Sequence, residues 1–277
     1  MSVIAVVNRK GGSGKSTLAT HLAACLASRG LGVMLGDVDR QPSTSAWLRR
    51  RATYNLRSAA IVGRSVDLRS VLRTPPGVSH TVLDTPGGLH GFELARTVML
   101  ADAILMPVCH SAFDRESSAA CLAELRRHPR VAVGRCKVAA VGMRIDMRTR
   151  GERELREWAQ ALDLPFLGVL RESQTYVRCV ERGLSIFDMP ASRVQIDLDQ
   201  WQAITTWLTD TLNERTAQDP PATGLRVARP ATSKAQANPL PPSATTAPQA
   251  PPKSAGGLRK LWAWLLPPRT TLPPTRS

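Results

Sequence analysis

The chain has 277 residues, which is enough to bury the core of one large domain or of two small ones. Hydrophobic residues make up 43% of the chain, but no run of 18 apolar residues occurs, and this excludes a membrane-spanning helix. The five cysteines lack the Cys-x-x-Cys spacing of a zinc site. The formal net charge of +15 fits either an anionic partner, such as DNA or a lipid surface, or an arginine-rich surface that is merely solvated.

From the N-terminus onward, short apolar strands alternate with longer helical patterns. The first segment, Met1-Ser2-Val3-Ile4, lacks the charged-then-apolar order of a signal peptide, so we expect a cytoplasmic protein. Strands are predicted at 3–7, 33–35, 81–83, 103–106 and 138–141, and helices at 16–28, 91–100, 114–127, 149–162 and 197–214. This alternation predicts an α/β fold over residues 1–215, in which helices flank a mainly parallel sheet and ligands bind at the carboxyl ends of the strands.

A glycine-rich loop joins the first strand to the first helix and has the composition of a P-loop. Its glycines let successive backbone N–H groups point at one phosphate cluster, and the helix N-terminus adds partial positive charge. Lys15 would neutralise the β- and γ-phosphates, and Ser16 would ligate Mg²⁺. A chance glycine-rich turn is the alternative, but the strand before the loop and the helix after it argue against that reading. The residues predicted to bind nucleotide are Lys10, Gly11, Gly12, Ser13, Gly14, Lys15, Ser16 and Thr17.

Acidic residues follow two of the later strands. Asp37 and Asp39 end the second strand, and two carboxylates at i and i+2 meet at one site where a strand breaks. They could also cap the helix that runs through Trp47. Asp84 ends an apolar strand in the Walker-B layout, where it would hold the metal, usually through water. No Asn-Lys-x-Asp motif follows, which argues against GTP, although a metal-free P-loop kinase or a GTPase is an alternative.

The loop departs from the general P-loop pattern, because Arg9 stands where a glycine is usual and Lys10 adds a second lysine. In this respect the sequence resembles the deviant Walker-A ATPases of the ParA/MinD family, whose signature is Lys-Gly-Gly-x-Gly-Lys-Thr/Ser-Thr/Ser. The segment 37–42 resembles the family's Asp-x-Asp-Pro-Gln switch, with Arg40 in place of the proline, and 84–88 resembles its second switch. Further similar stretches at 101–108, 111–114, 170–173 and 183–188 extend the resemblance to about residues 3–214.

The resemblance implies a single P-loop NTPase domain that hydrolyses ATP as a homodimer. In that family two subunits enclose two ATP molecules, and Lys10 corresponds to the lysine that reaches the partner's phosphates. The implied catalytic residues are Lys10, Lys15 and Asp39, with Asp39 positioning the attacking water. The implied Mg²⁺ site comprises Ser16, Asp84 and Asp37, with the two carboxylates acting through water.

One departure from the family concerns the base of the nucleotide. The stretches at 170–173 and 183–188 look like the loop and helix that lie beside adenine in the family. However, Val141-Gly142-Met143-Arg144 stands where many members carry an asparagine that reads the adenine edge, and a methionine cannot make those hydrogen bonds. Without that asparagine, contacts from the backbone would have to recognise the adenine base.

Relatives of the ParA type bind DNA without sequence preference through surface cations of the ATP dimer. Their slow ATP hydrolysis is triggered by an activating partner of the ParB type or by a cargo adaptor. In the matching stretch the candidates for DNA contact are Arg171, Arg178, Arg182 and Arg193, each of which, taken singly, is more often a solvated surface arginine. The five histidines form no ligand cluster, and we expect them to be structural.

The composition of the chain changes near Thr216. Thirteen of the 21 prolines lie at 220–274, so residues 216–257 are predicted to be a disordered linker and 267–277 a disordered end. Between them, 258–266 is predicted to form a short amphipathic helix that docks on a membrane surface or in a groove of a partner protein, unless the tail is inert. Its apolar side carries Leu258, Leu261, Trp262 and Leu265.

Together these patterns favour an ATP-dependent dimeric ATPase that positions or segregates a plasmid, a chromosome region or a protein cluster on nucleoid DNA. One alternative is a MinD-like ATPase that works at the membrane surface through 258–266. Another is an ATP-dependent assembly enzyme on the same scaffold, although the chain shows neither a paired-cysteine metal site nor a second catalytic domain.

Overall fold

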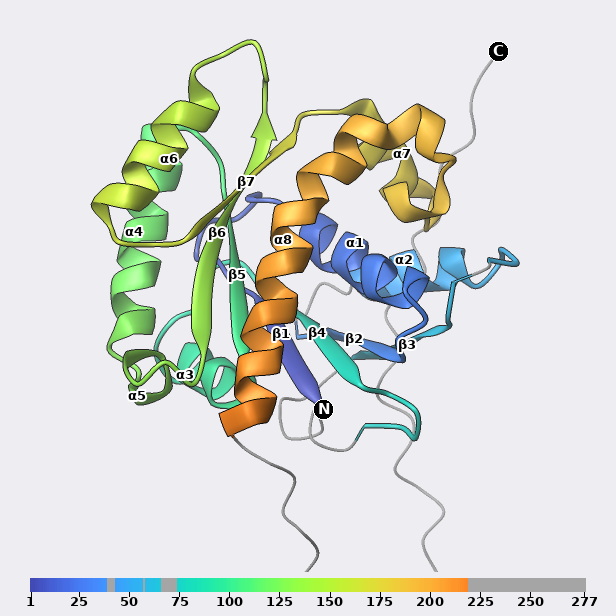
Figure 1. The fold of residues 1–277 in the computed structure, drawn as a ribbon, viewed down its shortest axis with the longest axis horizontal. Coiled ribbons are helices and arrows are strands. Elements are labelled where there is room, and N and C mark those ends of the chain that lie inside the picture. The colour runs from blue at the N-terminus through green and yellow to red at the C-terminus, as the bar shows by residue number, and fades with distance from the viewer. Residues whose placement is uncertain (39–42, 57, 66–73, 219–277) are drawn as a thin grey trace, which may run out of the picture. The chain divides into compact units, whose positions relative to one another are not determined.

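Seven strands pair into one sheet in which each neighbouring pair is parallel (Figure 1). Their order is β3-β2-β4-β1-β5-β6-β7. The strands are β1 (Ser2–Val6), β2 (Val33–Asp37), β3 (Ile61–Ser65), β4 (His80–Asp84), β5 (Ala103–Val108), β6 (Lys137–Ile145) and β7 (Phe166–Arg171). The computed structural model describes residues 1–38, 43–56, 58–65 and 74–218, which all lie within one unit, Met1–Leu225.

Helices cover both faces of the sheet because its strands are apolar on both faces. Side chains of β1 alternate between two cores: Ile4 and Val6 pack with α1 and α8, whereas Val3 and Ala5 pack with α3, α4 and α6. Burial on both faces is typical of a parallel sheet, so the predicted α/β class is confirmed. The helices are α1 (Lys15–Ser28), α2 (Ser43–Arg51), α3 (Gly91–Leu100), α4 (Ala112–Arg126), α5 (Pro129–Ala132), α6 (Gly151–Ala161), α7 (Gln174–Arg182) and α8 (Ala191–Gln218), with a 3-10 turn, η2 (Ile186–Asp188).

Within the described residues all the predicted strands and helices are present, but the sequence patterns do not predict the edge strands β3 and β7, because each contains a glycine. A Cβ atom at Gly63 would lie 2.4 Å from Leu48 Cδ1, so glycine lets α2 pack closely on β3. Gly168 has a φ of +98°, and the pairing of β7 with β6 is irregular nearby. In these strands Gly63 allows close packing and Gly168 lies near a bulge. A sequence pattern, by contrast, indicates the end of a strand at a glycine.

The C-terminal helix is longer than its pattern predicts. Helix α8 continues to Gln218, so the first three residues of the predicted linker 216–257 are helical. The rest of that linker, the predicted docking helix 258–266 and the end 267–277 lie outside the described residues. In the part of the chain that the structure describes, no helix is long and apolar enough to cross a bilayer.

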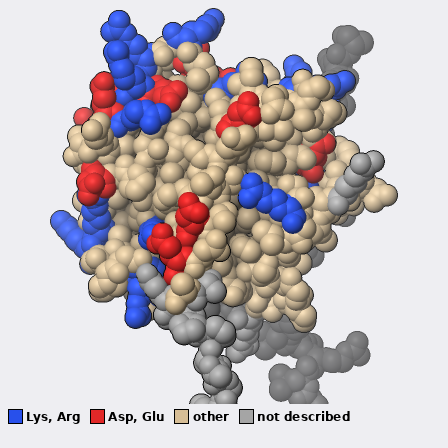
Figure 2. Space-filling view, in the orientation of Figure 1, with Lys and Arg blue, Asp and Glu red and all other residues tan. Residues whose placement is uncertain are grey.

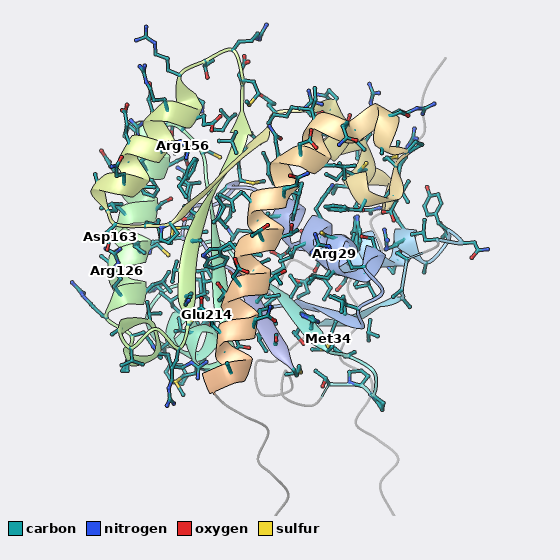
Figure 3. The ribbon with its side chains drawn as sticks, in the orientation of Figure 1. Arg29, Met34, Arg126, Arg156, Asp163 and Glu214 are labelled. Carbon is teal, nitrogen blue, oxygen red and sulfur yellow. The ribbon has the colours of Figure 1, made fainter. Side chains whose placement is uncertain are left out.

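The arginines divide between an exposed rim and structural contacts. In Figure 2, Lys and Arg side chains gather along the rim over α6 and α7, toward which the carboxyl ends of the strands point, with acidic side chains among them. Charged side chains of both signs are sparser over the centre of this face, near α8. Arg126 has a structural contact: it donates to the carbonyl oxygens of Leu162 and Asp163, at 2.6 and 2.8 Å, and ties the end of α4 to the end of α6 (Figure 3).

Helix α2 is fixed at its C-terminal end to the loop that follows α7. Arg51 donates to both carboxylate oxygens of Asp188, at 2.7 and 2.9 Å, and both side chains are buried. Trp47 Nε1 donates to the carbonyl oxygen of Leu184 at 3.0 Å. Burial acts to raise the pKa of the Asp188 carboxyl, but hydrogen bonds from Arg51 and Ser185 outweigh it and hold that pKa below its usual range. The carboxylate is therefore ionised at neutral pH and anchors α2.

We expect Asp188→Asn to lower the free energy of unfolding by about 3–5 kcal/mol, because it leaves the buried Arg51 guanidinium without a counter-charge. Since the pKa of Asp188 is depressed in the folded state, the stability from this pair is fully present above the unfolded value of about 3.9 and is lost as the pH falls through the folded value. Urea unfolding at pH 7, repeated at acidic pH, measures both effects.

Asp146→Asn is the matched control, because it removes the carboxylate partner of Arg148, whose side chain is 90% exposed. That change should cost much less than Asp188→Asn, because water and salt screen an exposed ion pair. Equal losses in the two variants would show that the Arg51–Asp188 pair is not a buried anchor.

Candidate nucleotide-binding site

The loop between β1 and α1 has a backbone that only glycine adopts readily. Gly12 and Gly14 have φ values of +73° and +92°, and Gly14 is the N-cap of α1. A Cβ atom on Gly14 would lie 2.9 Å from Met143 Cε, so a side chain there would also have to displace the end of the Met143 side chain. The loop thus delivers the chain directly into the N-terminus of α1, where free N–H groups favour an anion.

Buried hydrogen bonds fix the first residues of the loop. The Asn8 amide is fully buried and donates to the carbonyl oxygen of Pro107 at 2.7 Å and to Ser118 Oγ at 2.9 Å. Its own oxygen accepts from the Lys10 N–H at 3.2 Å. These partners lie on β5 and α4, so the loop is held in shape by the body of the domain.

Arg9, which replaces the usual glycine, ties the loop to α4. Its guanidinium forms an ion pair with Glu124, and Glu124 also accepts from the Gly91 N–H at 2.6 Å. The Arg9 carbonyl oxygen accepts from the Gly88 N–H at 2.7 Å. One residue therefore connects the phosphate loop with the segment that follows Asp84, a contact that sequence spacing alone does not reveal.

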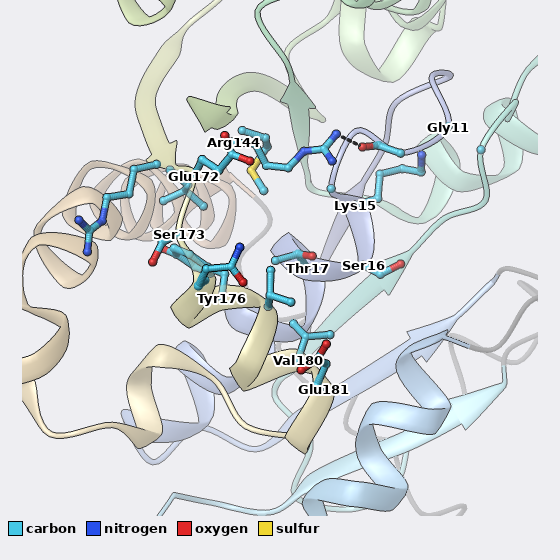
Figure 4. A pocket seen from close by; sticks show the side chains of 18 of the residues that line it. Gly11, Lys15, Ser16, Thr17, Arg144, Glu172, Ser173, Tyr176, Val180 and Glu181 are labelled. Carbon is cyan, nitrogen blue, oxygen red and sulfur yellow. Dashed lines mark hydrogen bonds between the residues drawn. The ribbon is translucent and has the colours of Figure 1, made fainter. Parts of the chain in front are cut away.

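A cavity of about 670 Å³ opens beside the loop (Figure 4). Lys15 lines it and is buried, and its Nζ donates to the carbonyl oxygen of Lys10 at 2.9 Å. Gly87 approaches from the second switch, where a Cβ atom would lie 3.9 Å from Lys15 Nζ. The loop residues predicted to bind nucleotide that line the cavity are Gly11, Gly12, Gly14, Lys15, Ser16 and Thr17. Lys10 is exposed and is not among the lining residues.

Asp37 and Asp84 lie level with each other at the carboxyl ends of β2 and β4. They are 2% and 1% exposed, and Asp84 is also level with Val6, just before the loop. The Asp37 carboxylate accepts from the Ser45 N–H at 3.3 Å, so it also caps the start of α2, as the alternative reading predicts. Asp39 lies outside the described residues, together with 40–42.

The donor set at this edge fits Mg²⁺. Among the described residues no three His, Cys, Asp or Glu side chains gather into a metal cage. Mg²⁺ does not need one, because in nucleotide sites it is bound by one or two carboxylates, by phosphate oxygens and by water. A serine at the start of α1, Ser16, and two buried carboxylates supply oxygen donors of this kind.

The far wall of the cavity belongs to β7, α7 and the segment between them, and it mixes apolar with polar side chains. The predicted stretch 170–173 lines it, but 183–188 does not line it and instead contacts α2. Sequence reasoning missed the contribution of α7, although its lining residues recur at the spacing of one helical face. Those residues are Gln174, Tyr176, Val177, Val180 and Glu181.

The predicted DNA-contacting arginines separate into two groups. Arg171 donates through Nε and Nη2 to the buried carboxylate of Asp197, at 2.7 and 3.0 Å. This pair gives Arg171 a structural role between β7 and α8, and its contact with DNA stays a prediction. Arg178, Arg182 and Arg193 are exposed on α7 and on the first turn of α8, where an anionic partner can reach them.

His21, on α1, has the structural role expected of the histidines. It is fully buried, and its Nδ1 lies 2.9 Å from the carbonyl oxygen of Thr17. Its ring packs against Tyr176, with centroids 4.9 Å apart, and stacks near Trp201 at 6.3 Å. Burial lowers the pKa of His21 to about 4, so the imidazole is neutral in the folded protein at physiological pH.

Comparisons with known proteins agree with this geometry. The family model described as the CobQ/CobB/MinD/ParA nucleotide binding domain matches residues 4–186. A "Maintenance of carboxysome distribution protein A" from Gloeobacter kilaueensis is 34% identical over 186 residues, which are 66% of this chain and 83% of that protein.

Two solved structures share the fold at low identity. An ATP complex of McdA from Cyanothece superposes with a TM-score of 0.56 at 16% identity, over 77% of this chain and 96% of that chain. A putative plasmid partition protein from Borrelia burgdorferi, bound to AMPPNP, superposes with a TM-score of 0.58 at 18% identity, over 74% of this chain and 99% of that chain.

We expect the free energy of unfolding to fall by about 3 kcal/mol between pH 6.5 and pH 4 through His21 alone. The folded-state pKa of about 4 lies below the unfolded value of 6.5, so acid protonates the unfolded chain first and favours unfolding. Denaturant unfolding across this range measures the slope. His21→Leu should remove this part of the slope while His80, whose pKa burial also lowers, still titrates in both proteins. Identical slopes would mean that His21 is not held neutral.

Proposed function

The chain belongs to the CobQ/CobB/MinD/ParA family of nucleotide-binding domains, and on this premise we propose that it is a dimerising ATPase that positions or segregates a cargo on nucleoid DNA. The observation that carries the proposal is the preformed phosphate loop, whose Lys15 is buried against the cavity while Lys10 is exposed outside it. One lysine thus serves its own subunit, and the other is free to serve a second one.

ATP and Mg²⁺ are the cofactors of this site. Lys15 and the N–H groups at the start of α1 bind the phosphates, and Ser16, Asp84 and Asp37 hold the metal directly or through water. Bound Mg²⁺ neutralises charge that develops on the phosphates. Lys10 adds a second cation to the partner's phosphates only in the dimer, so hydrolysis is slow until a partner protein or cargo adaptor stabilises that state.

The exposed arginines supply a surface for DNA in the cytoplasm. Arg182 lies in the last turn of α7, and α2 ends beside it in Arg49 and Arg50. The two helices touch there, because Arg50 Nη2 donates to the carbonyl oxygen of Val180 at 3.2 Å. Dimerisation doubles the number of cations that face the phosphate backbone, which favours DNA binding by the ATP form.

The names of the relatives indicate the kind of cargo but not its identity. The relative from Gloeobacter kilaueensis is named for carboxysome distribution, which supports a protein cluster as the cargo, and the Borrelia protein is named for plasmid partition. An activating partner of the ParB type or a cargo adaptor completes the cycle. The segment 258–266 lies outside the described residues, so a membrane-surface role has only sequence support.

We expect Lys15→Ala to weaken ATP binding about 100-fold or more, because its ammonium contacts the phosphates in every state. Lys10→Ala should leave ATP binding by the monomer unchanged and prevent formation of the ATP dimer. A fluorescent ATP analogue measures the first effect and light scattering the second. Lys137→Ala, at the opposite edge of the sheet, is the control and should change neither. A Lys10→Ala protein that dimerises normally would refute the role of Lys10.

We expect the ATP form to bind DNA of any sequence more tightly than the ADP form and to lose affinity steeply with salt, since counterion release drives binding. Changing Arg178, Arg182 and Arg193 to Glu should reduce the slope of log K against log salt by about 5 for a dimer. Fluorescence anisotropy with labelled DNA measures the slope, and liposome sedimentation tests the membrane alternative in parallel.

The control for the DNA surface reverses the same number of charges on the opposite helical layer, at Arg127, Arg153 and Arg156. These changes should have a smaller effect on the slope. Equal binding in ATP and ADP at all salt concentrations would contradict a nucleotide-controlled DNA surface.

A further inference from the structure

Arg144 has a backbone conformation that is unfavourable for an arginine. Its φ is +54°, and among the described residues only one other non-glycine residue, Asp163, has a positive φ. It lies near the end of β6, where the register with β7 shifts between Met143 and Ile145. A side chain held in the left-handed region at a bulge costs free energy unless its contacts compensate.

The compensating contacts are with the phosphate loop. Arg144 Nη2 donates to the carbonyl oxygen of Gly12 and lies 3.5 Å from Cys109 Sγ, on the segment between β5 and α4 (Figure 4). Arg144 also lines the cavity. Its guanidinium therefore connects three segments that meet at the carboxyl edge of the sheet.

The preceding residue, Met143, supports the same loop. Met143 is buried and its Cε occupies the space that a Cβ atom on Gly14 would need. Two consecutive residues of β6 thus contact the two left-handed glycines of the loop: Met143 contacts Gly14, and Arg144 contacts Gly12. The end of β6 thus supports the loop from one side at these two glycines.

The orientation of the Gly12 carbonyl matters for an anionic ligand. Since a trans peptide is planar, holding the Gly12 oxygen also fixes the direction of the Ser13 N–H, one of the donors that such a loop presents to phosphate. A carbonyl oxygen turned toward a phosphate would instead repel it. The positive guanidinium holds that oxygen and offsets its partial negative charge.

We propose that Arg144 is a positioning residue of the phosphate loop, which holds the Gly12–Ser13 peptide in the orientation that binds nucleotide phosphates. The proposal rests on nucleotide binding at this site. It explains why β6 keeps an arginine where a glycine would fit the backbone more easily, because a glycine cannot hold the Gly12 carbonyl.

The test compares Arg144→Gly with Arg144→Ala. Both remove the guanidinium, but glycine suits the positive φ and alanine does not. We expect both variants to raise the Kd for fluorescent ADP and ATP by about tenfold. Without nucleotide, Arg144→Gly should have a higher Tm than Arg144→Ala. Hydrogen exchange of the peptide that spans 11–16 should be faster in both variants than in the wild type.

Arg148→Ala is the matched control, because it removes an arginine of the same region whose side chain is 90% exposed. It should leave Kd and hydrogen exchange of the loop unchanged. If Arg144→Gly binds nucleotide as tightly as the wild type, Arg144 sets only the backbone and the proposal is overturned. An equal loss in Arg148→Ala would overturn it as well, since net charge would then explain the effect. If the proposed function itself were wrong, the wild type would bind neither ADP nor ATP. That outcome differs from the one in which only the role of Arg144 is wrong.

Discussion

The parallel register of three central strands determines where the site forms. Asp84 at the end of β4 lies level with Val6 of β1 on one side and with Asp37 of β2 on the other. Because parallel strands run in the same direction, their carboxyl ends meet at one edge, and the phosphate loop leaves β1 at that edge. A register slip of one residue would turn a carboxylate to the opposite face. The sheet thus holds the two acids level with each other and beside the start of the loop.

Helix α2 links this edge to the exposed basic surface. Asp37 caps its N-terminal end, and the buried pair of Arg51 with Asp188 fixes its C-terminal end to the loop after α7. Helix α7 in turn lines the cavity through Val177 and carries Arg182 on the outside. A change at the end of β2 therefore has a short, packed route to the surface proposed for DNA. This continuity is a physical basis for the control of DNA binding by nucleotide that we propose.

Sequence patterns predicted the features that depend on residues close together in the chain. They missed the contacts between residues that are far apart in the chain. The loop at 10–17 and Asp84 could be identified because a strand, a turn and a helix follow each other in the chain. The partners that hold the loop could not, since Ser118, Glu124 and Arg144 are more than a hundred residues away from it. The pattern of charges in the sequence likewise does not predict the pairing of Arg171 with Asp197. The edge strands β3 and β7 were missed because Gly63 serves close packing against Leu48 and Gly168 serves a positive φ, and a hydrophobic pattern shows neither.

The proposed function requires that this domain close into a dimer around ATP. Analytical ultracentrifugation of the full chain with Mg²⁺ and a non-hydrolysable ATP analogue, compared with Mg²⁺ and ADP, tests it most directly. The expected result is a dimer with the ATP analogue and a monomer with ADP at the same protein concentration, with one nucleotide bound per subunit in each case. A single mass in both conditions, with nucleotide bound, would contradict ATP-dependent dimerisation.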